Sequence, residues 1–178
     1  MIDRKKIRKI IGYTHEKQIS NPDLWYKKSL AFHEATTVLY EFKERIRNRI
    51  YFYTAALSLE LILKTISVME GQDINDLKTH NLRTLCNRAE VQLNEDQMFL
   101  LYFFSESTIW FSRYPAPLLE EEWDNYQDNV FEKLIVRKRL DSSSGYTRVA
   151  PKRFPSIDNY NDIWEVCLTK CKSVSLRD

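Results

Sequence analysis

The sequence predicts an all-α protein: a bundle of four to five long helices in one domain over residues 21–178, preceded by a basic N-terminal arm over residues 1–20 and completed by a C-terminal extension. Glycine occurs only three times in 178 residues, whereas 13% of the residues are aromatic. Tight hairpins need residues that tolerate positive φ, so this composition disfavours an antiparallel sheet. Apolar residues also recur at helical spacing in several segments, and the chain is long enough for one complete hydrophobic core.

The first long helix is expected over residues 20–46, SNPDLWYKKSLAFHEATTVLYEFKERI. Asn21 can cap its N-terminus, Pro22 suits the first helical position because its missing N–H is not needed there, and Asp23 favours the positive end of the helix dipole. His33 is expected on the exposed surface of this helix. The side chains predicted to face the core recur at sums of three and four: Trp25, Phe32, Leu39, Phe42 and Ile46.

A central helix is expected over residues 50–71, IYFYTAALSLELILKTISVMEG, because residues 55–69 are apolar on nearly all sides. Gly71 is placed to end this helix. Within it, Glu60 and Lys64 are four residues apart, in the orientation that favours an ion pair. Two interpretations stay open: a solvated pair worth about 0.3–0.5 kcal/mol, or a partly buried pair that contacts another helix or a partner chain.

A third helix is expected in HNLRTLCNRAEVQL, residues 80–93, with Thr79 as its cap and His80 in its first turn. The exposed N–H groups and the dipole of a helix N-terminus favour an anion at such a position. A fourth helix is expected to open at Asn94, whose spacing to Gln97 resembles a capping box, and to end in WFSRYPAP. Its predicted stripe runs through Met98, Leu101, Tyr102, Ser105 and Ile109.

A fifth helix is expected over residues 118–140, LLEEEWDNYQDNVFEKLIVRKRL, followed by a mobile linker or insertion over residues 141–155, where Ser, Gly and Pro gather. Ser156 can cap a last helix. The fifth helix is expected to place on one side Leu119, Trp123, Tyr126, Val130 and Leu134. The last helix is expected to place inward Tyr160, Ile163, Trp164, Cys167 and Cys171.

The net charge is only +2, which by itself does not indicate a nucleic-acid-binding protein. Basic residues nevertheless cluster at three places: Arg4, Lys5, Lys6, Arg8 and Lys9; Arg45, Arg47 and Arg49; Arg137, Lys138 and Arg139. Such clusters usually form solvated surface. Two of them brought together by the fold would form a phosphate-binding face.

No apolar run reaches the roughly 18 residues of a membrane span, and the N-terminus lacks the features of a signal peptide, so we expect a cytoplasmic protein without a membrane partner. Three cysteines suggest free thiols in a reducing compartment. Cys167 and Cys171 could seat two metal ligands, but a zinc site needs three or four, and we expect no metal. The chain has no glycine-rich phosphate loop, HExxH motif or nucleophile elbow, and we expect no cofactor.

Three motifs occur in order along the chain: YFYTAALSLELILKTISVMEG, then KTHNLRTL, then a helix that ends in SRYP. Their order and spacing resemble the HEPN domain, a small all-α fold of prokaryotic and eukaryotic proteins. The resemblance covers roughly residues 23–115, and the last predicted helix would complete the bundle. It implies a bundle of four or five helices, usually paired into a dimer, that binds nucleotides or RNA. Many such proteins work in toxin–antitoxin or phage-defence systems, often beside a nucleotidyltransferase partner.

Catalytic members of that family cut RNA without a metal, using an arginine followed a few residues later by a histidine on a late helix. The arginine would hold the scissile phosphate, and histidines at the dimer cleft would transfer protons. This sequence departs from the pattern, because no histidine follows His80. Arg8 and His15 have a similar spacing, but they lie in the N-terminal arm, and we attribute that match to chance.

The resemblance places the helix-starting histidine and the arginine of the RYP motif at His80 and Arg113, which are the candidate catalytic residues. The candidate nucleotide- or RNA-binding residues are Glu60, Lys64, His80, Arg113 and Tyr114. Structural roles compete with these functions. His80 can hydrogen-bond a neighbouring loop, and Arg113 can pair with Glu60 to lock the bundle.

We therefore expect a dimeric, HEPN-like protein that binds RNA or a nucleotide. One alternative is a metal-independent endoribonuclease with a non-standard site, in which His80 and Arg113 do the chemistry. A second alternative is a non-catalytic helical adaptor whose apolar helices pair with another protein. A shared fold does not decide among these functions.

Overall fold

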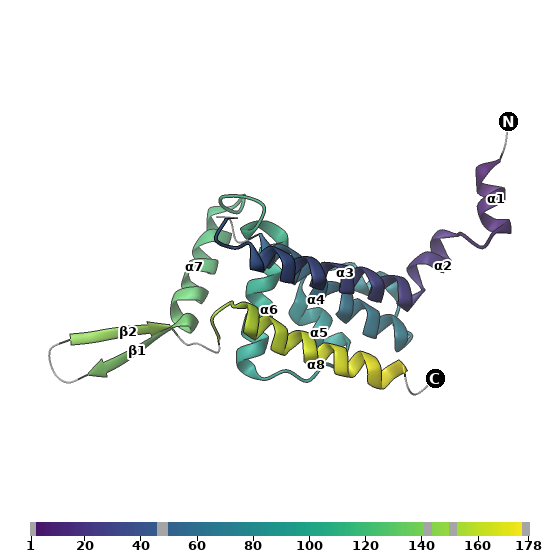
Figure 1. Ribbon diagram of the computed structural model, residues 1–178. Helices are drawn as coiled ribbons and strands as arrows, with labels where there is room; N and C mark the ends of the chain where they lie inside the picture. The colour runs from purple at the N-terminus through teal and green to yellow at the C-terminus, as the bar shows by residue number, and fades with distance from the viewer. Residues whose placement is uncertain (1–2, 46–49, 141–143, 150–152, 176–178) are drawn as a thin grey trace.

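The computed structural model describes residues 3–45, 50–140, 144–149 and 153–175 and shows a predominantly helical chain, as predicted (Figure 1). Its helices are α1 (Arg4–Ile10), α2 (His15–Ile19), α3 (Pro22–Glu41), α4 (Tyr51–Met69), α5 (Leu82–Arg88), α6 (Glu95–Glu106), α7 (Glu120–Leu134) and α8 (Ile157–Ser175). Two short turns accompany them, the 3₁₀ turn η1 (Ile74–Leu77) and the π turn η2 (Ser107–Phe111). One hairpin is formed by β1 (Ile135–Leu140) and β2 (Ser144–Val149).

α4 is the central helix, as its composition predicts. It packs against α3, α5, α6 and α8, and most of its side chains are buried. Among the described helices, α4 alone has the length and hydropathy to cross a membrane. Within its most apolar stretch, 67% of the residues are buried inside the bundle. A helix that is covered by neighbours on all sides needs apolar residues all round, which accounts for this composition.

The caps predicted at Asn21, Asn94 and Ser156 and the stop at Gly71 are confirmed, whereas α5, expected over residues 80–93, spans only Leu82–Arg88. Asn21 caps α3 by accepting a hydrogen bond from an N–H of the first turn, and Asn94 and Gln97 form a complete capping box at α6. Ser156 accepts a hydrogen bond from the backbone at the start of α8. Gly71 follows α4 with a φ of 75°, a conformation that glycine adopts without strain.

The buried face of α3 differs from the prediction. Ser29 and Thr36 are fully buried, and the Oγ1 atoms of Thr36 and Thr54 on α4 lie 2.9 Å apart. α3 ends at Glu41, so Phe42, predicted to be buried, is 47% exposed. Small residues let two helices approach closely, and α3 packs against α4 through the side that carries Ser29 and Thr36. Three side chains predicted to face the core are only half-buried: Trp25, Phe32 and Leu39. The fifth, Ile46, lies outside the described residues.

α6 changes its geometry before it reaches the SRYP motif. It continues beyond Glu106 into the π turn η2. Because a π turn adds a residue to the helical repeat, it rotates the side chains that follow. Trp110 is therefore buried, whereas Ile109, predicted to face inward, is 48% exposed.

Residues 135–149 depart most from the prediction. α7 ends at Leu134, and the remainder of the predicted helix forms β1. β1 pairs with β2 in antiparallel register, from Ile135 opposite Val149 to Leu140 opposite Ser144. The predicted linker over 141–155 therefore contains a strand, and the hairpin projects away from the helices (Figure 1). Its β-branched and aromatic residues favour extended backbone and outweigh the helical pattern that precedes them.

The basic N-terminal arm also projects from the bundle (Figure 1). No residue of α1 is buried. α2 is joined to α3 through the indole N–H of Trp25, which donates to the carbonyl oxygen of Ile19 at 2.7 Å. α2 is thus held at the start of α3, and α1 extends beyond it.

Because α3 contacts α4 through small side chains, two substitutions on α3 should differ in their effect on the free energy of unfolding. Ser29→Leu should lower the free energy of unfolding by about 1–3 kcal/mol, because the larger side chain meets α4. Val38→Leu, at a position that is 53% exposed, should change it by less than about 0.5 kcal/mol. Urea unfolding followed by circular dichroism measures both values. Similar losses in the two variants would contradict the observed face of α3.

Candidate functional site

The predicted pair of Glu60 and Lys64 is the centre of an ionic cluster. Lys64 Nζ lies 2.7 Å from Glu60 Oε1, and His80 Nδ1 lies 2.9 Å from Glu60 Oε2. The side chains of Glu60 and Lys64 are only 5% and 9% exposed, whereas that of His80 is 63% exposed. Of the two interpretations of this pair, the structure supports the buried one. Each carboxylate oxygen has a partner, which a charge removed from water requires.

His80 is oriented by this cluster. It lies just before α5 rather than in its first turn, because Asn81 and not Thr79 is the helix cap. A carboxylate oxygen only accepts hydrogen bonds, so Nδ1 of His80 carries the hydrogen that Glu60 receives, and Nε2 is the basic nitrogen. A buried carboxylate that fixes one imidazole nitrogen in this way prepares the other for proton transfer.

Trp25 connects the ionic cluster to the N-terminal arm. Lys64 Nζ lies 5.9 Å from the centroid of the Trp25 ring, within the range of a cation–π contact. The indole N–H of the same residue holds α2 through Ile19. Trp25, predicted as a core residue, is half-buried instead and forms part of a pocket wall.

That pocket lies between α2, the start of α3 and the middle of α4 and has a volume of about 380 Å³. Its apolar lining residues are Ile19, Leu24, Trp25 and Leu61, and its polar ones are His15, Gln18 and Lys28. A pocket of this size with an apolar wall and a few polar groups is typical of small-ligand sites. The sequence did not reveal it, because its walls come from three elements that no motif links.

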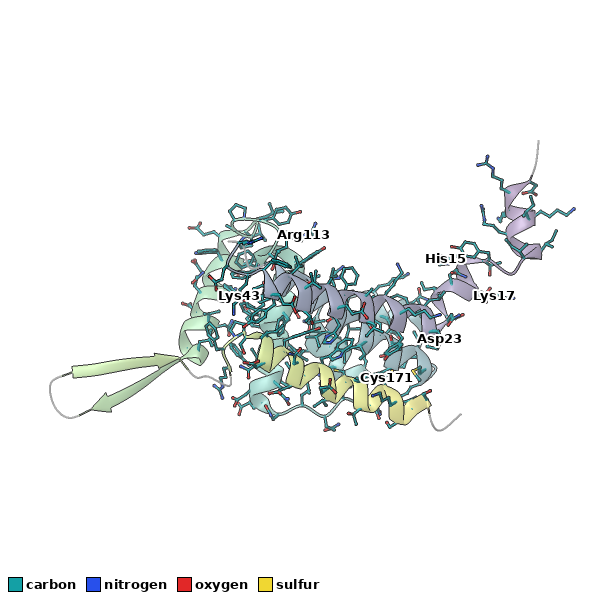
Figure 2. The ribbon with its side chains drawn as sticks, in the orientation of Figure 1. His15, Lys17, Asp23, Lys43, Arg113 and Cys171 are labelled. Atoms are coloured by element: carbon teal, nitrogen blue, oxygen red, sulfur yellow. The ribbon has the colours of Figure 1, made fainter. Side chains whose placement is uncertain are left out.

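Arg113 and Tyr114 lie apart from the cluster. The Arg113 guanidinium donates a hydrogen bond of 3.1 Å to the Tyr114 hydroxyl and sits 5.1 Å from the centroid of that ring. Figure 2 shows Arg113 and His15 at opposite ends of the bundle. The predicted pair of Arg113 with Glu60 is not formed, because both oxygens of Glu60 have other partners. His80 contacts the middle of α4 and not the SRYP end of α6.

His33, predicted as a surface residue, belongs to a second polar network, which joins α3, α4 and α8. Its ring stacks on Trp164 with centroids 4.3 Å apart and planes within 5°. His33 Nδ1 lies 2.8 Å from the Tyr160 hydroxyl, which is also 2.6 Å from Ser58 Oγ. Burial lowers the pKa of His33 and raises that of Tyr160, so both are neutral at neutral pH. The sequence did not predict this network because 127 positions separate His33 from Tyr160.

The three cysteines are free and buried. Cys167 and Cys171 face the core from α8, as predicted, and burial raises the pKa of Cys86 to about 11. Buried thiols of this kind behave as small apolar side chains. Within the described ranges, no three His, Cys, Asp or Glu side chains converge as metal ligands would.

Because Glu60 and Lys64 form a buried pair, replacing one of the two charges should lower the free energy of unfolding more than replacing both. Lys64→Met should lower the free energy of unfolding by about 3–5 kcal/mol, because the Glu60 charge loses its buried partner. Glu60→Leu/Lys64→Met, which replaces both charges with apolar side chains, should recover most of that loss. Lys27→Met on the exposed side of α3 is the control. Urea unfolding gives all three values, and a double variant as unstable as the single one would contradict the buried pair.

Comparison with known proteins identifies no relative of this chain. No protein-family model, curated protein or solved structure matches the chain. Function therefore has to be argued from the ionic cluster, the pocket and the sequence motifs themselves.

Proposed function

We propose that this chain is a HEPN-like protein that binds RNA or a nucleotide, works as a homodimer and acts with a partner protein of the nucleotidyltransferase type in a prokaryotic defence or toxin–antitoxin system. The order of the sequence motifs motivates the family. The observation that supports the binding function is the pocket beside Trp25, where an aromatic ring, a lysine and a histidine line one space.

The lining of the pocket suits a ligand with a flat apolar part and an anionic part. A base can lie against Trp25 and Leu61, since every base has a π-face that contacts aromatic and apolar groups. The side-chain amide of Gln18 offers both a donor and an acceptor to a base edge. Lys28 supplies the positive charge that a phosphate requires. A nucleotide combines these properties, and a single-stranded RNA repeats them.

The oriented imidazole of His80 favours a second candidate function, a metal-independent endoribonuclease. In this function, Nε2 of His80 takes the proton of a 2′-hydroxyl, the 2′-oxygen attacks phosphorus, and the 5′-oxygen leaves with a proton from a general acid. The products are a 2′,3′-cyclic phosphate and a 5′-hydroxyl. Arg113 of the same chain lies at the far end of the bundle (Figure 2), so the arginine that holds the phosphate would come from the second chain.

Ligand binding is tested with two neighbouring lysines. Lys28→Glu should weaken the binding of a fluorescent oligouridine about tenfold and reduce the salt dependence by about one phosphate contact. Lys27→Glu is the matched control, because it makes the same charge change at an exposed position that does not line the pocket. Fluorescence anisotropy over a salt series gives both quantities, for oligouridine and for a labelled ATP.

Equal effects of the two lysine variants would exclude the pocket as the binding site. If the wild-type protein bound neither probe even at low salt, the binding function would be wrong, and the adaptor function would take its place.

Cleavage is tested on the same samples in excess chelator. If the protein is a nuclease, His80→Ala should slow single-turnover cleavage by about 10²–10⁴-fold, because it removes the proton acceptor. His15→Ala, which changes a histidine of the pocket, controls for effects on binding. RNA that is bound but stays intact with the wild-type protein would reject the nuclease function and leave the binding function standing.

A further inference from the structure

Residues 3–13 form the outer part of the N-terminal arm, called the arm from here on, and expose apolar and basic side chains together. Ile7, Ile10 and Ile11 share one face of the helical turn, at positions i, i+3 and i+4, and are 44%, 74% and 68% exposed. Five basic side chains surround them: Arg4, Lys5, Lys6, Arg8 and Lys9. The arm holds a single carboxylate, Asp3. An exposed apolar patch rimmed by charge is typical of a surface that binds another molecule.

Residues 118–128, which lead into α7 and form its first nine positions, have the opposite charge and a similar apolar character. We call this segment the acidic surface. It exposes three large apolar side chains, Leu118, Leu119 and Trp123, with exposed fractions of 99%, 60% and 38%. It carries five carboxylates, Glu120, Glu121, Glu122, Asp124 and Asp128, and its sequence has no lysine or arginine. Trp123 packs on Trp110 with ring centroids 5.8 Å apart, so this surface is anchored to the bundle.

The arm and the acidic surface lie at opposite ends of the molecule (Figure 1). α3 runs between these ends and is about 30 Å long at 1.5 Å per residue. α2 is held on α3 by Trp25, so α1 is joined to the bundle only through the short segment between α1 and α2. α1 itself is only about 10 Å long. The arm therefore cannot reach the acidic surface of its own chain.

We propose that the arm of one chain docks on the acidic surface of a second copy, in a two-fold dimer. A two-fold axis across the long direction of the molecule places the arm of each copy on α7 of the other, so both contacts form at once. In each contact the isoleucines cover Leu119 and Trp123. The basic side chains that flank the isoleucines on α1, Lys6 and Arg8, face the carboxylates that flank Leu119 and Trp123 on α7, Glu120 and Glu122. This assigns a surface to the dimer of the proposed function, but it does not depend on RNA binding.

Nucleic acid is the other macromolecule that a basic arm attracts. Phosphate binding would use the basic side chains of the arm and leave Ile7, Ile10 and Ile11 in water. The acidic surface provides partners for both kinds of side chain, since it is apolar and negatively charged. The isoleucine face therefore favours a second copy of this chain.

Two full-length variants test the dimer by exchange of charge. The arm variant is Lys6→Glu/Arg8→Glu, at the two positions that flank the isoleucine face of α1. The surface variant is Glu120→Lys/Glu122→Lys, at the two positions that flank Leu119 and Trp123 on α7. Each variant alone places like charges at both contacts, so its dimerisation should weaken at least about tenfold. In an equimolar mixture, every arm can face a surface of opposite charge, so heterodimers should form. Sedimentation equilibrium measures both results.

The matched control is Asp158→Lys/Asp162→Lys, which makes the same charge change on exposed positions of α8 and should dimerise like the wild type. Circular dichroism checks that each variant is folded. A monomeric wild-type protein, or a mixture that stays monomeric, would overturn the proposal. An arm variant that keeps its dimer but loses oligouridine binding would show that the arm binds nucleic acid instead. Loss of pocket binding in Lys28→Glu is a separate result and leaves the dimer untouched.

Discussion

The rest of the structure depends on the burial of α4. Burying a leucine or isoleucine side chain of this helix stabilises the fold by about 1.5–3 kcal/mol, so the stability of the chain depends on covering most of α4. Four helices provide that cover: α3, α5, α6 and α8. α3 contributes its narrow side, with Ser29 and Thr36 at the contact, because small side chains bring the two helix axes together. The positions of the remaining elements follow from this arrangement.

Two groups of buried polar side chains on α4 are completed by residues from distant parts of the chain. Glu60 is matched by Lys64 within the helix and by His80 from the loop before α5. Ser58 is matched by the Tyr160 hydroxyl of α8, which His33 of α3 also contacts. Both arrangements satisfy buried groups that would otherwise destabilise the bundle. The first of them differs in one respect, since it includes the exposed imidazole of His80.

The pocket, the arm and the acidic surface all lie outside the region where other helices cover α4. The pocket beside Trp25 forms where α2 meets α3, and its polar residues stand at the margin of an apolar wall. The arm and the acidic surface of α7 lie beyond the bundle at opposite ends. Because the two carry opposite charge and each exposes apolar side chains, association of copies would cover surface that the single chain leaves in water. The proposed ligand pocket and the proposed dimer contact thus lie in different parts of the molecule.

The sequence alone determined the features that depend on neighbours along the chain. The caps at Asn21 and Asn94, the central position of α4 and the approach of Glu60 to Lys64 all follow from spacings within one helix. Only the tertiary structure decided which side of α3 is buried, where His80 lies, and that the helical pattern after Leu134 gives way to a hairpin. The buried side of α3 and the position of His80 depend on contacts between residues far apart in the chain, whereas the hairpin depends on the pairing of β1 with β2. A helical pattern carries no information about the shape or polarity of a distant partner, so helix packing and burial settle the first two features and strand pairing settles the third.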